Sequence, residues 1–140
     1  MHLGVGMPSA KQVWGNLREE MAERALLRAG YAIVARNWRG GRGEIDRIAW
    51  KSGVLCFVEV RARSTDFFGT PAETVASSKQ RKLVRAAAAY LMRYPPKLRP
   101  DIRFDIVSIL DPPNGPRTIE IIPNAFDATV SRVDKPCRFF

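Results

Sequence analysis

Two carboxylates and one cation lie in two neighbouring apolar segments of the chain. Asp46 lies in "EIDRIAW" (44–50), and Glu59 and Arg61 lie in "CFVEVRAR" (56–63). Charged groups in a buried strand are costly unless they are paired or used. Mg²⁺ is commonly held by one or two carboxylates, with waters and a phosphate completing its shell. These residue types therefore suit metal-assisted phosphodiester hydrolysis, in which the metal activates a water and the cation stabilises the transition state.

The turn "KSG" (51–53) predicts that the segments on either side of it pair as a β-hairpin. A turn centred on Ser52 places position 46 opposite position 58 or nearby, so Glu59 becomes a close neighbour of Asp46. Side chains alternate along a strand, which places Glu59 and Arg61 on one face. A structural interpretation stays open, in which Glu59 simply pairs with Arg61 or another arginine, because this spacing is a weak signal.

Apolar periodicity and turn residues divide the chain into two helices and several short strands. Consecutive strands joined by short turns favour antiparallel pairing, whereas the second helix permits a parallel crossover. The order α-β-β-β-α-β predicts an α/β fold, a mixed β-sheet flanked by helices. We expect one domain over 12–126, between an N-terminal tail (1–11) and a C-terminal tail (127–140). The expected helices are 12–29 and 77–94, and the expected strands are 31–38, 44–50, 54–60, 101–110 and 118–123.

Sequence patterns in the two expected helices predict a buried stripe on the first helix and an N-terminal cap on the second. The first has an apolar residue at every fourth position, which predicts a buried stripe. In the second, Ser77 and Gln80 fit a capping box. The expected stripe of the first helix consists of Val13, Leu17, Met21 and Ala25, widened by Leu26 and Ala29. The expected apolar side of the second helix consists of Leu83, Ala87, Tyr90, Leu91 and Tyr94.

The chain is strongly basic, with 23 Lys and Arg against 14 Asp and Glu and a net charge of +9. This excess favours a polyanionic partner, although it also aids solubility. Cations near the acidic segments suit contacts to a nucleic-acid backbone, and a solvated helix face is the plainer alternative. Phe67 and Phe68 are candidates for stacking on bases or for packing in the core. The candidate backbone-binding residues are Arg36, Arg39, Arg42, Arg63, Lys79 and Lys82.

Other residue types exclude several function classes. His2 is the single histidine, which removes Ser-His catalysis and histidine-based zinc sites. Cys56 and Cys137 form no disulfide framework, which favours a reducing, cytoplasmic compartment. The chain has no apolar run of about 18 residues, so we expect no membrane span. Asp105, in "RFDI", is expected to pair with Arg103 or a loop arginine.

An ordered set of motifs resembles the YraN-like family of small bacterial proteins, which belongs to the PD-(D/E)XK restriction-endonuclease-like superfamily. The motifs are "REEMAERALLRAGY", "ARNWRGGRGEID", "FVEVRAR", "GTPAETVASSKQRKL" and "RFDIVSI", and the likeness covers about residues 15–126. The chain also looks like the archaeal Holliday-junction resolvases of that superfamily. The resemblance implies a restriction-endonuclease-like fold and a Mg²⁺- or Mn²⁺-dependent endonuclease. It further implies DNA as the partner, bound without sequence specificity, with branched DNA as one candidate and a homodimer as an option by analogy.

The same resemblance assigns roles to four residues. It places Asp46 at the first metal position, Glu59 at the second and Arg61 at the position of the motif lysine. Glu19 matches the further metal ligand on the first helix, although helical geometry alone does not separate Glu19 from Glu20. Arg61 departs from the motif, which usually has lysine at this position. Arginine stays protonated and cannot act as a base. A nucleic-acid-binding protein with weak or no hydrolysis, and a subunit that binds an acidic protein, therefore stay open as alternatives.

Overall fold

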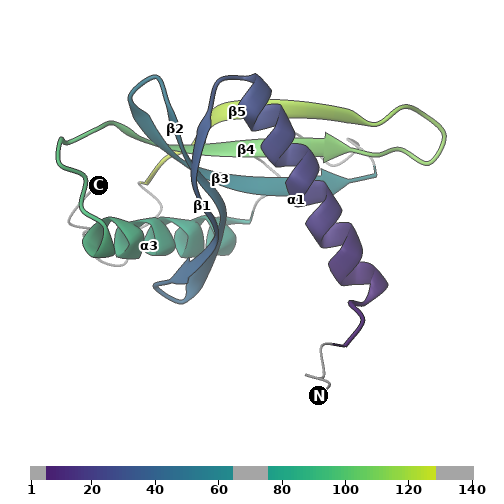
Figure 1. Ribbon diagram of the computed structural model, residues 1–140, viewed down its shortest axis with the longest axis horizontal. Coiled ribbons are helices and arrows are strands. Elements are labelled where there is room, and N and C mark those ends of the chain that lie inside the picture. The colour runs from purple at the N-terminus through teal and green to yellow at the C-terminus, as the bar shows by residue number, and fades with distance from the viewer. Residues whose placement is uncertain (1–5, 65–75, 129–140) are drawn as a thin grey trace, which may run out of the picture.

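The computed structural model describes residues 6–64 and 76–128, which form two helices and five strands (Figure 1). No helix in this part of the chain is long and apolar enough to cross a membrane. The predicted α-β-β-β-α-β order is confirmed, and the expected last strand, 118–123, follows it as β5. In chain order the elements are α1 (Ala10–Arg28), β1 (Ala32–Gly40), β2 (Gly43–Lys51), β3 (Val54–Arg63), α3 (Ser77–Arg93), β4 (Ile102–Leu110) and β5 (Thr118–Phe126).

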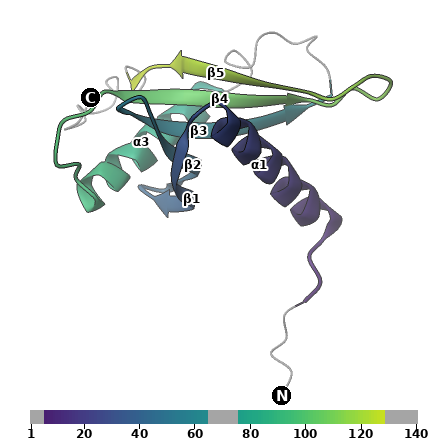
Figure 2. The same ribbon diagram turned by 45° about the horizontal axis from the view of Figure 1, so that its top comes forward.

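The five strands form one mixed sheet in the order β1-β2-β3-β4-β5. Neighbouring strands are antiparallel except for β3 and β4, which are parallel. Parallel strands need a long connection, and α3 provides the crossover that the sequence predicted. The β1–β2 hairpin lies between the two helices in both views (Figures 1 and 2).

The sheet carries a separate apolar core on each face. On one face, Phe57 of β3 packs with Leu83 and Tyr90 of α3. On the other face, Cys56 and Val58 belong to a second cluster, which contains Ala22 and Leu26 of α1. Because side chains alternate along a strand, β3 contributes to both cores and is buried on both faces, as the sequence predicted.

The start of α1 differs from the sequence prediction. The helix begins at Ala10, two residues before the expected start and inside the expected tail. Ser9 and Gln12 form a capping box: the Ser9 hydroxyl accepts a bond from the Gln12 N–H at 3.2 Å, and the Gln12 side chain accepts one from the Ser9 N–H at 2.9 Å.

The expected stripe of α1 is wrong in its first half, since Val13 and Leu17 are 42% and 48% exposed. Ala22 and Leu26 are the buried residues of the helix. The first turns of α1 project away from the strands in both views (Figures 1 and 2). Of their apolar side chains, Trp14 lines a cavity with Ala62 and Arg63 of β3.

α3 begins at Ser77, as expected, but its N-terminal cap differs from the prediction. The residue at the N-cap position is Ala76, and it makes no side-chain capping bond. The predicted capping box of Ser77 and Gln80 is therefore wrong, because Ser77 already lies inside the helix. The apolar side expected for α3 is largely confirmed, with Leu83, Ala87 and Tyr90 buried.

Candidate active site

A tight turn sets the register that brings the two carboxylates together. Lys51 pairs with Val54, so only Ser52 and Gly53 lie between the strands, and both have positive φ (49° and 79°). Two central residues with positive φ define the type I′ turn that suits the twist of a hairpin. Arg47 is consequently opposite Val58. The expected register, with position 46 opposite 58, was off by one residue, and the shift places Asp46 level with Glu59.

Asp46 and Glu59 form an acidic pair on the face of the sheet that α3 covers, with Glu59 buried and Asp46 half-buried. The Glu59 side chain is only 5% exposed. One Asp46 oxygen accepts a hydrogen bond from the Val60 N–H at 2.8 Å, which fixes the carboxyl group against β3. Burial, and then the charge of Glu59 close by, raise the pKa of Asp46 to about 8. Two carboxyl groups in such a place favour a shared proton or a bound cation.

Lys79 of α3 supplies a cation to this pair. Its Nζ lies 2.6 Å from Oε1 of Glu59. Lysine was expected only as a contact to the nucleic-acid backbone, and the expected partner of Glu59 in the structural interpretation was an arginine. The motif places a cation on the same strand as Glu59, at Arg61. In the structure the cation in contact with Glu59 is Lys79, which comes from α3.

A cavity of about 290 Å³ opens beside the acidic pair. Its walls come from the end of the β1–β2 hairpin, from β3 and from the first turns of α3. Gly43 allows the close approach of these elements, because a Cβ at this position would lie 2.7 Å from the backbone oxygen of Lys82. The lining residues are Gly43, Glu44, Asp46, Glu59, Ser78, Lys79, Lys82 and Leu83.

Glu19 lies apart from this cavity, among residues between α1 and the hairpin. Its carboxylate accepts a hydrogen bond from the Asn37 side chain at 2.9 Å and lies 3.6 Å from the guanidinium of Arg47. Its charge contributes to the raised pKa of Asp46, as the smallest of the causes. Glu20 is exposed. Within residues 6–64 and 76–128, no three acidic, histidine or cysteine side chains lie close enough together to hold a metal ion.

The donor set of the cavity still fits a divalent cation held by two ligands. Mg²⁺ prefers carboxylate oxygens, often uses only one or two of them, and keeps several waters. Asp46 and Glu59 are such a pair, and a cation between them would relieve the repulsion that raises the Asp46 pKa. Asp46 and Glu59 would hold the ion, and Lys79 would be displaced from Oε1 of Glu59. Glu19 does not line this cavity and is not among these ligands.

The predicted backbone-binding cations do not form one patch. Lys79 and Lys82 line the acidic cavity, and Arg42 is exposed at the nearby hairpin turn. Arg36 lies on the α1 side, where its Nε donates to Glu23 at 2.6 Å and lowers the pKa of that carboxyl group.

The remaining arginines have other surroundings. Arg39 is 3.8 Å from Glu44. Arg61 and Arg63 are half-buried, and Arg63 lines a different cavity beside Trp14. The candidates Phe67 and Phe68 lie outside the described residues.

The sequence interpretation missed a buried cation on the α1 face. Arg47 is buried, and its guanidinium lies 2.9 Å from Glu23 and 3.6 Å from Glu19. It also donates to the backbone oxygen of Asp46 at 2.7 Å, so it links the α1 carboxylates to the strand that carries Asp46. The signal was available, since Arg47 directly follows Asp46 in an alternating strand and therefore points to the opposite face.

Asp105 belongs to a second buried network, separate from the cavity. Arg103 donates to both of its oxygens at 2.8 and 2.9 Å, which confirms the predicted pair. The Tyr31 hydroxyl donates to it at 2.8 Å, and the Asn124 N–H at 2.9 Å. A fully buried carboxylate with four donors joins β4 to β5 and to Tyr31, the residue before β1, which indicates a structural role.

The fold and the acidic pair define a class of protein. A five-stranded mixed sheet with a helix on each face is an α/β arrangement consistent with the restriction-endonuclease-like fold. The sequence model of Uncharacterised protein family UPF0102 matches residues 18–109, and the chain belongs to this family.

Relatives in several bacteria carry the same family name. The UPF0102 protein of Myxococcus xanthus is 41% identical over 122 residues, covering 86% of this chain and 94% of the relative. The relative from Symbiobacterium thermophilum is 45% identical over 114 residues, covering 81% and 96%. That from Desulfosudis oleivorans is 42% identical over 125 residues, covering 89% and 98%.

Proposed function

We propose that this protein is a Mg²⁺-dependent DNA endonuclease that hydrolyses phosphodiester bonds at the Asp46–Glu59 pair. The observation that carries the proposal is that two neighbouring carboxylates, Glu59 buried and Asp46 half-buried, line one cavity, with Lys79 bonded to Glu59. Pairs of titratable groups whose surroundings strongly perturb a pKa are frequent in active sites. The net charge of +9 supports a polyanionic substrate. We also propose a cytoplasmic location, which fits the free thiol of Cys56.

The chain's own residues would divide the work as follows. Asp46 and Glu59 would hold the cation, which, when bound, polarises the phosphodiester and lowers the pKa of a water. Lys79 would stabilise charge that develops on the transferred phosphoryl group, because its ammonium lies at the cavity wall beside Glu59. Lys82, which lines the same cavity, would contact the phosphate backbone of the bound DNA.

Lys79 offers the cavity a lysine, which the motif position lacks because it holds Arg61. An arginine at the motif position cannot release a proton, whereas a lysine amine can. Lys79 reaches Glu59 from α3 and so offers the cavity the kind of cation that the motif usually supplies from the strand. Arg61 would then serve as a positive neighbour on the same strand.

A second function has its own support, namely DNA binding with little or no hydrolysis. The contact between Lys79 and Glu59 occupies an oxygen that a metal would need, and no third ligand joins the pair in the described residues. Such a protein would retain the basic surface and the fold. Branched DNA bound by a homodimer is compatible with either function, by analogy with resolvases.

A cleavage assay separates the two functions. Purified protein is incubated with supercoiled plasmid, a flap duplex and a four-way junction, with Mg²⁺, with Mn²⁺ and with a chelator. We expect metal-dependent cutting that Asp46→Asn and Glu59→Gln abolish. Glu44→Gln is the matched control, because Glu44 lines the same cavity but is exposed and pairs with Arg39. Salt-dependent binding without cutting on any substrate would favour the second function, and the absence of both would remove DNA as the partner.

A further inference from the structure

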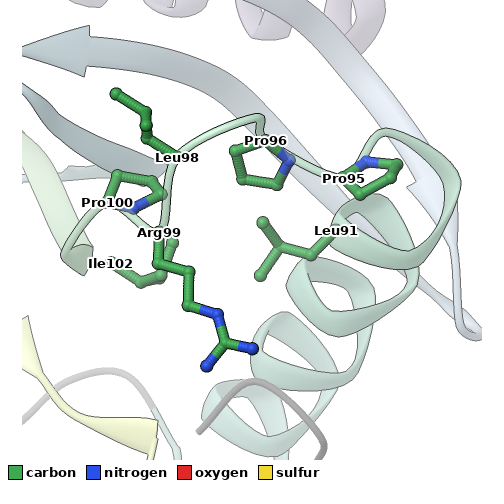
Figure 3. A pocket seen from close by; sticks show the side chains of 7 residues that line it. All are labelled: Leu91, Pro95, Pro96, Leu98, Arg99, Pro100 and Ile102. Carbon is green, nitrogen blue, oxygen red and sulfur yellow. The ribbon is translucent and has the colours of Figure 1, made fainter.

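A second cavity, of about 320 Å³, lies at the other end of α3 (Figure 3). It is formed where the helix ends and the chain turns toward β4. Leu91 lines this cavity and Lys79 lines the acidic one. The two residues are 12 positions apart, or about 18 Å along the helix, so the cavities are distinct. Its walls are apolar apart from one guanidinium. The lining residues are Leu91, Pro95, Pro96, Leu98, Arg99, Pro100 and Ile102.

Apolar side chains around this cavity are unusually exposed. Leu98 is 83% exposed, and Met92 and Tyr94 are 63% and 48% exposed. These are three of the nine large apolar side chains exposed in the described residues, and they fall within seven consecutive positions. Clustered apolar exposure of this kind marks an interaction site more often than scattered single residues do.

Prolines restrict the backbone around this cavity before anything binds to it. Three of its seven lining residues are prolines, whose φ is fixed by the ring. Leu91, on the floor, is 1% exposed and held in the main core. A ligand would therefore lose little free energy to ordering this loop, which favours binding by a small apolar group.

The charge around the cavity is positive. Arg99 lines it, Arg93 and Lys97 lie in the same segment of the chain, and Asp101 is the one carboxylate in the segment 92–102. In the part of the chain that the structure describes, no carboxylate lies within ion-pair distance of Lys97 or Arg99, whereas Arg36 and Arg47 each have one. Arg99 also lines the cavity, so its guanidinium can pair with an acidic group next to a side chain bound there (Figure 3).

We propose that this cavity binds an acidic peptide segment of a partner protein, with one bulky aliphatic or aromatic side chain inserted among the prolines and a carboxylate on Arg99. The charge argues against two other protein occupants. The chain's own residues 129–140 contain three cations and one carboxylate, and a second copy of the chain carries the same net charge of +9. Single-stranded nucleic acid fits less well, because bases bind on aromatic faces and the lining has none.

Fluorescence anisotropy with a small peptide set tests this proposal. Each labelled peptide has two aspartates on either side of one varied central residue, and the full-length protein is the titrant. We expect binding with Leu, Met, Phe or Trp at the centre, none with Ser or Lys, and none when lysines replace the aspartates. The affinity should fall as salt rises, because charge pairs at the rim are screened. No binding of any peptide at millimolar protein would overturn the proposal.

Variants in the same segment locate the site. Leu98→Asp and Arg99→Glu should each weaken binding by about tenfold or more, as loss of an anchor residue does. Leu27→Asp and Arg28→Glu are the matched controls, because both residues are exposed on α1 and neither lines the cavity. Circular dichroism verifies that all four variants fold. Equal effects in all four variants would contradict the assignment to this cavity.

Two further arms exclude the other occupants. Labelled oligothymidylate replaces the peptide in the first arm, and sedimentation of the wild type and Leu98→Asp forms the second. Oligothymidylate binding that Leu98→Asp abolishes would assign the cavity to nucleic acid and overturn the proposal. A dimer that Leu98→Asp dissociates would likewise assign it to a second copy. None of these readouts depends on DNA cleavage, so they test this proposal independently of the proposed nuclease function.

Discussion

The Nζ atom of Lys79 on α3 lies 2.6 Å from Oε1 of Glu59 on β3. The two residues are 20 positions apart and meet because α3 crosses from β3 to β4 over the face that carries Asp46 and Glu59. A buried carboxylate that loses a cation partner becomes costly. The contact therefore links the stability of the cavity to its proposed chemistry, and several measurements can separate the two.

Replacing Lys79 tests its proposed part in hydrolysis. Lys79→Gln should lower the rate of DNA cleavage by about 10²-fold, the effect of removing one group that stabilises developing charge. The same change should tighten Mn²⁺ binding, measured by calorimetry, because Glu59 no longer has a competing cation. Lys11→Gln is the control, since Lys11 is exposed on α1 and does not line the cavity. Unchanged cleavage in Lys79→Gln would exclude Lys79 from the reaction.

The raised pKa of Asp46 makes stability depend on pH in a defined direction. A carboxyl group whose pKa rises from 3.8 to about 8 on folding binds its proton more tightly in the folded state. Its contribution to stability is fully present below pH 3.8 and is lost as pH rises toward 8. Without metal, Asp46→Asn should therefore raise the free energy of unfolding at pH 8.5 by on the order of 1–3 kcal/mol. Urea unfolding of both proteins at pH 5 and 8.5 measures this, and a larger gain at pH 5 would contradict the assignment.

Gly43 allows α3 to approach the hairpin, and a methyl group there should separate them. Gly43→Ala places a Cβ 2.7 Å from the backbone oxygen of Lys82, which cannot move without the helix. The expected loss is about 1–3 kcal/mol of stability, together with weaker metal binding.

Gly15→Ala is the matched control for Gly43→Ala, because it lies within α1 with no atom within 4 Å of the added Cβ. It should stabilise the protein by about 1 kcal/mol, as alanine does in an exposed helix. Equal urea midpoints for the two variants would show that the contact between the hairpin and α3 is not tight.

The Asp105 network should matter for stability and not for activity. Asp105→Asn weakens the pair with Arg103 inside a fully buried site, at a cost of about 3 kcal/mol. Cleavage by the fraction that remains folded should be unchanged, because the network is separate from the acidic cavity. Thermal unfolding and specific activity, measured together at low temperature, test this. A selective loss of activity without a loss of stability would give Asp105 a functional role.

Most of the fold could be predicted from the sequence because its signals are local. The apolar run of β3 predicted a strand buried on both faces, and the glycine after Ser52 predicted the hairpin. The register was off by one residue, since a turn centred on Ser52 and a two-residue turn of Ser52 and Gly53 cannot be distinguished by composition alone.

The site was less predictable because its parts come from distant segments. The pair of Asp46 with Glu59 followed from the hairpin, but the contact of Lys79 with Glu59 depends on how α3 packs over the sheet. Glu19 was expected as a metal ligand, and the structure places it against Arg47 and Asn37. Arg47 attracts it there because a buried guanidinium needs carboxylate partners.

Anomalous scattering from a crystal soaked in Mn²⁺ tests the central claim, that Asp46 and Glu59 jointly hold a divalent cation. The account predicts one strong peak with carboxylate oxygens of both residues about 2.1 Å away, and Lys79 moved from Oε1 of Glu59. A map with no peak between the two carboxylates, and with the Lys79–Glu59 contact intact at saturating Mn²⁺, would contradict it.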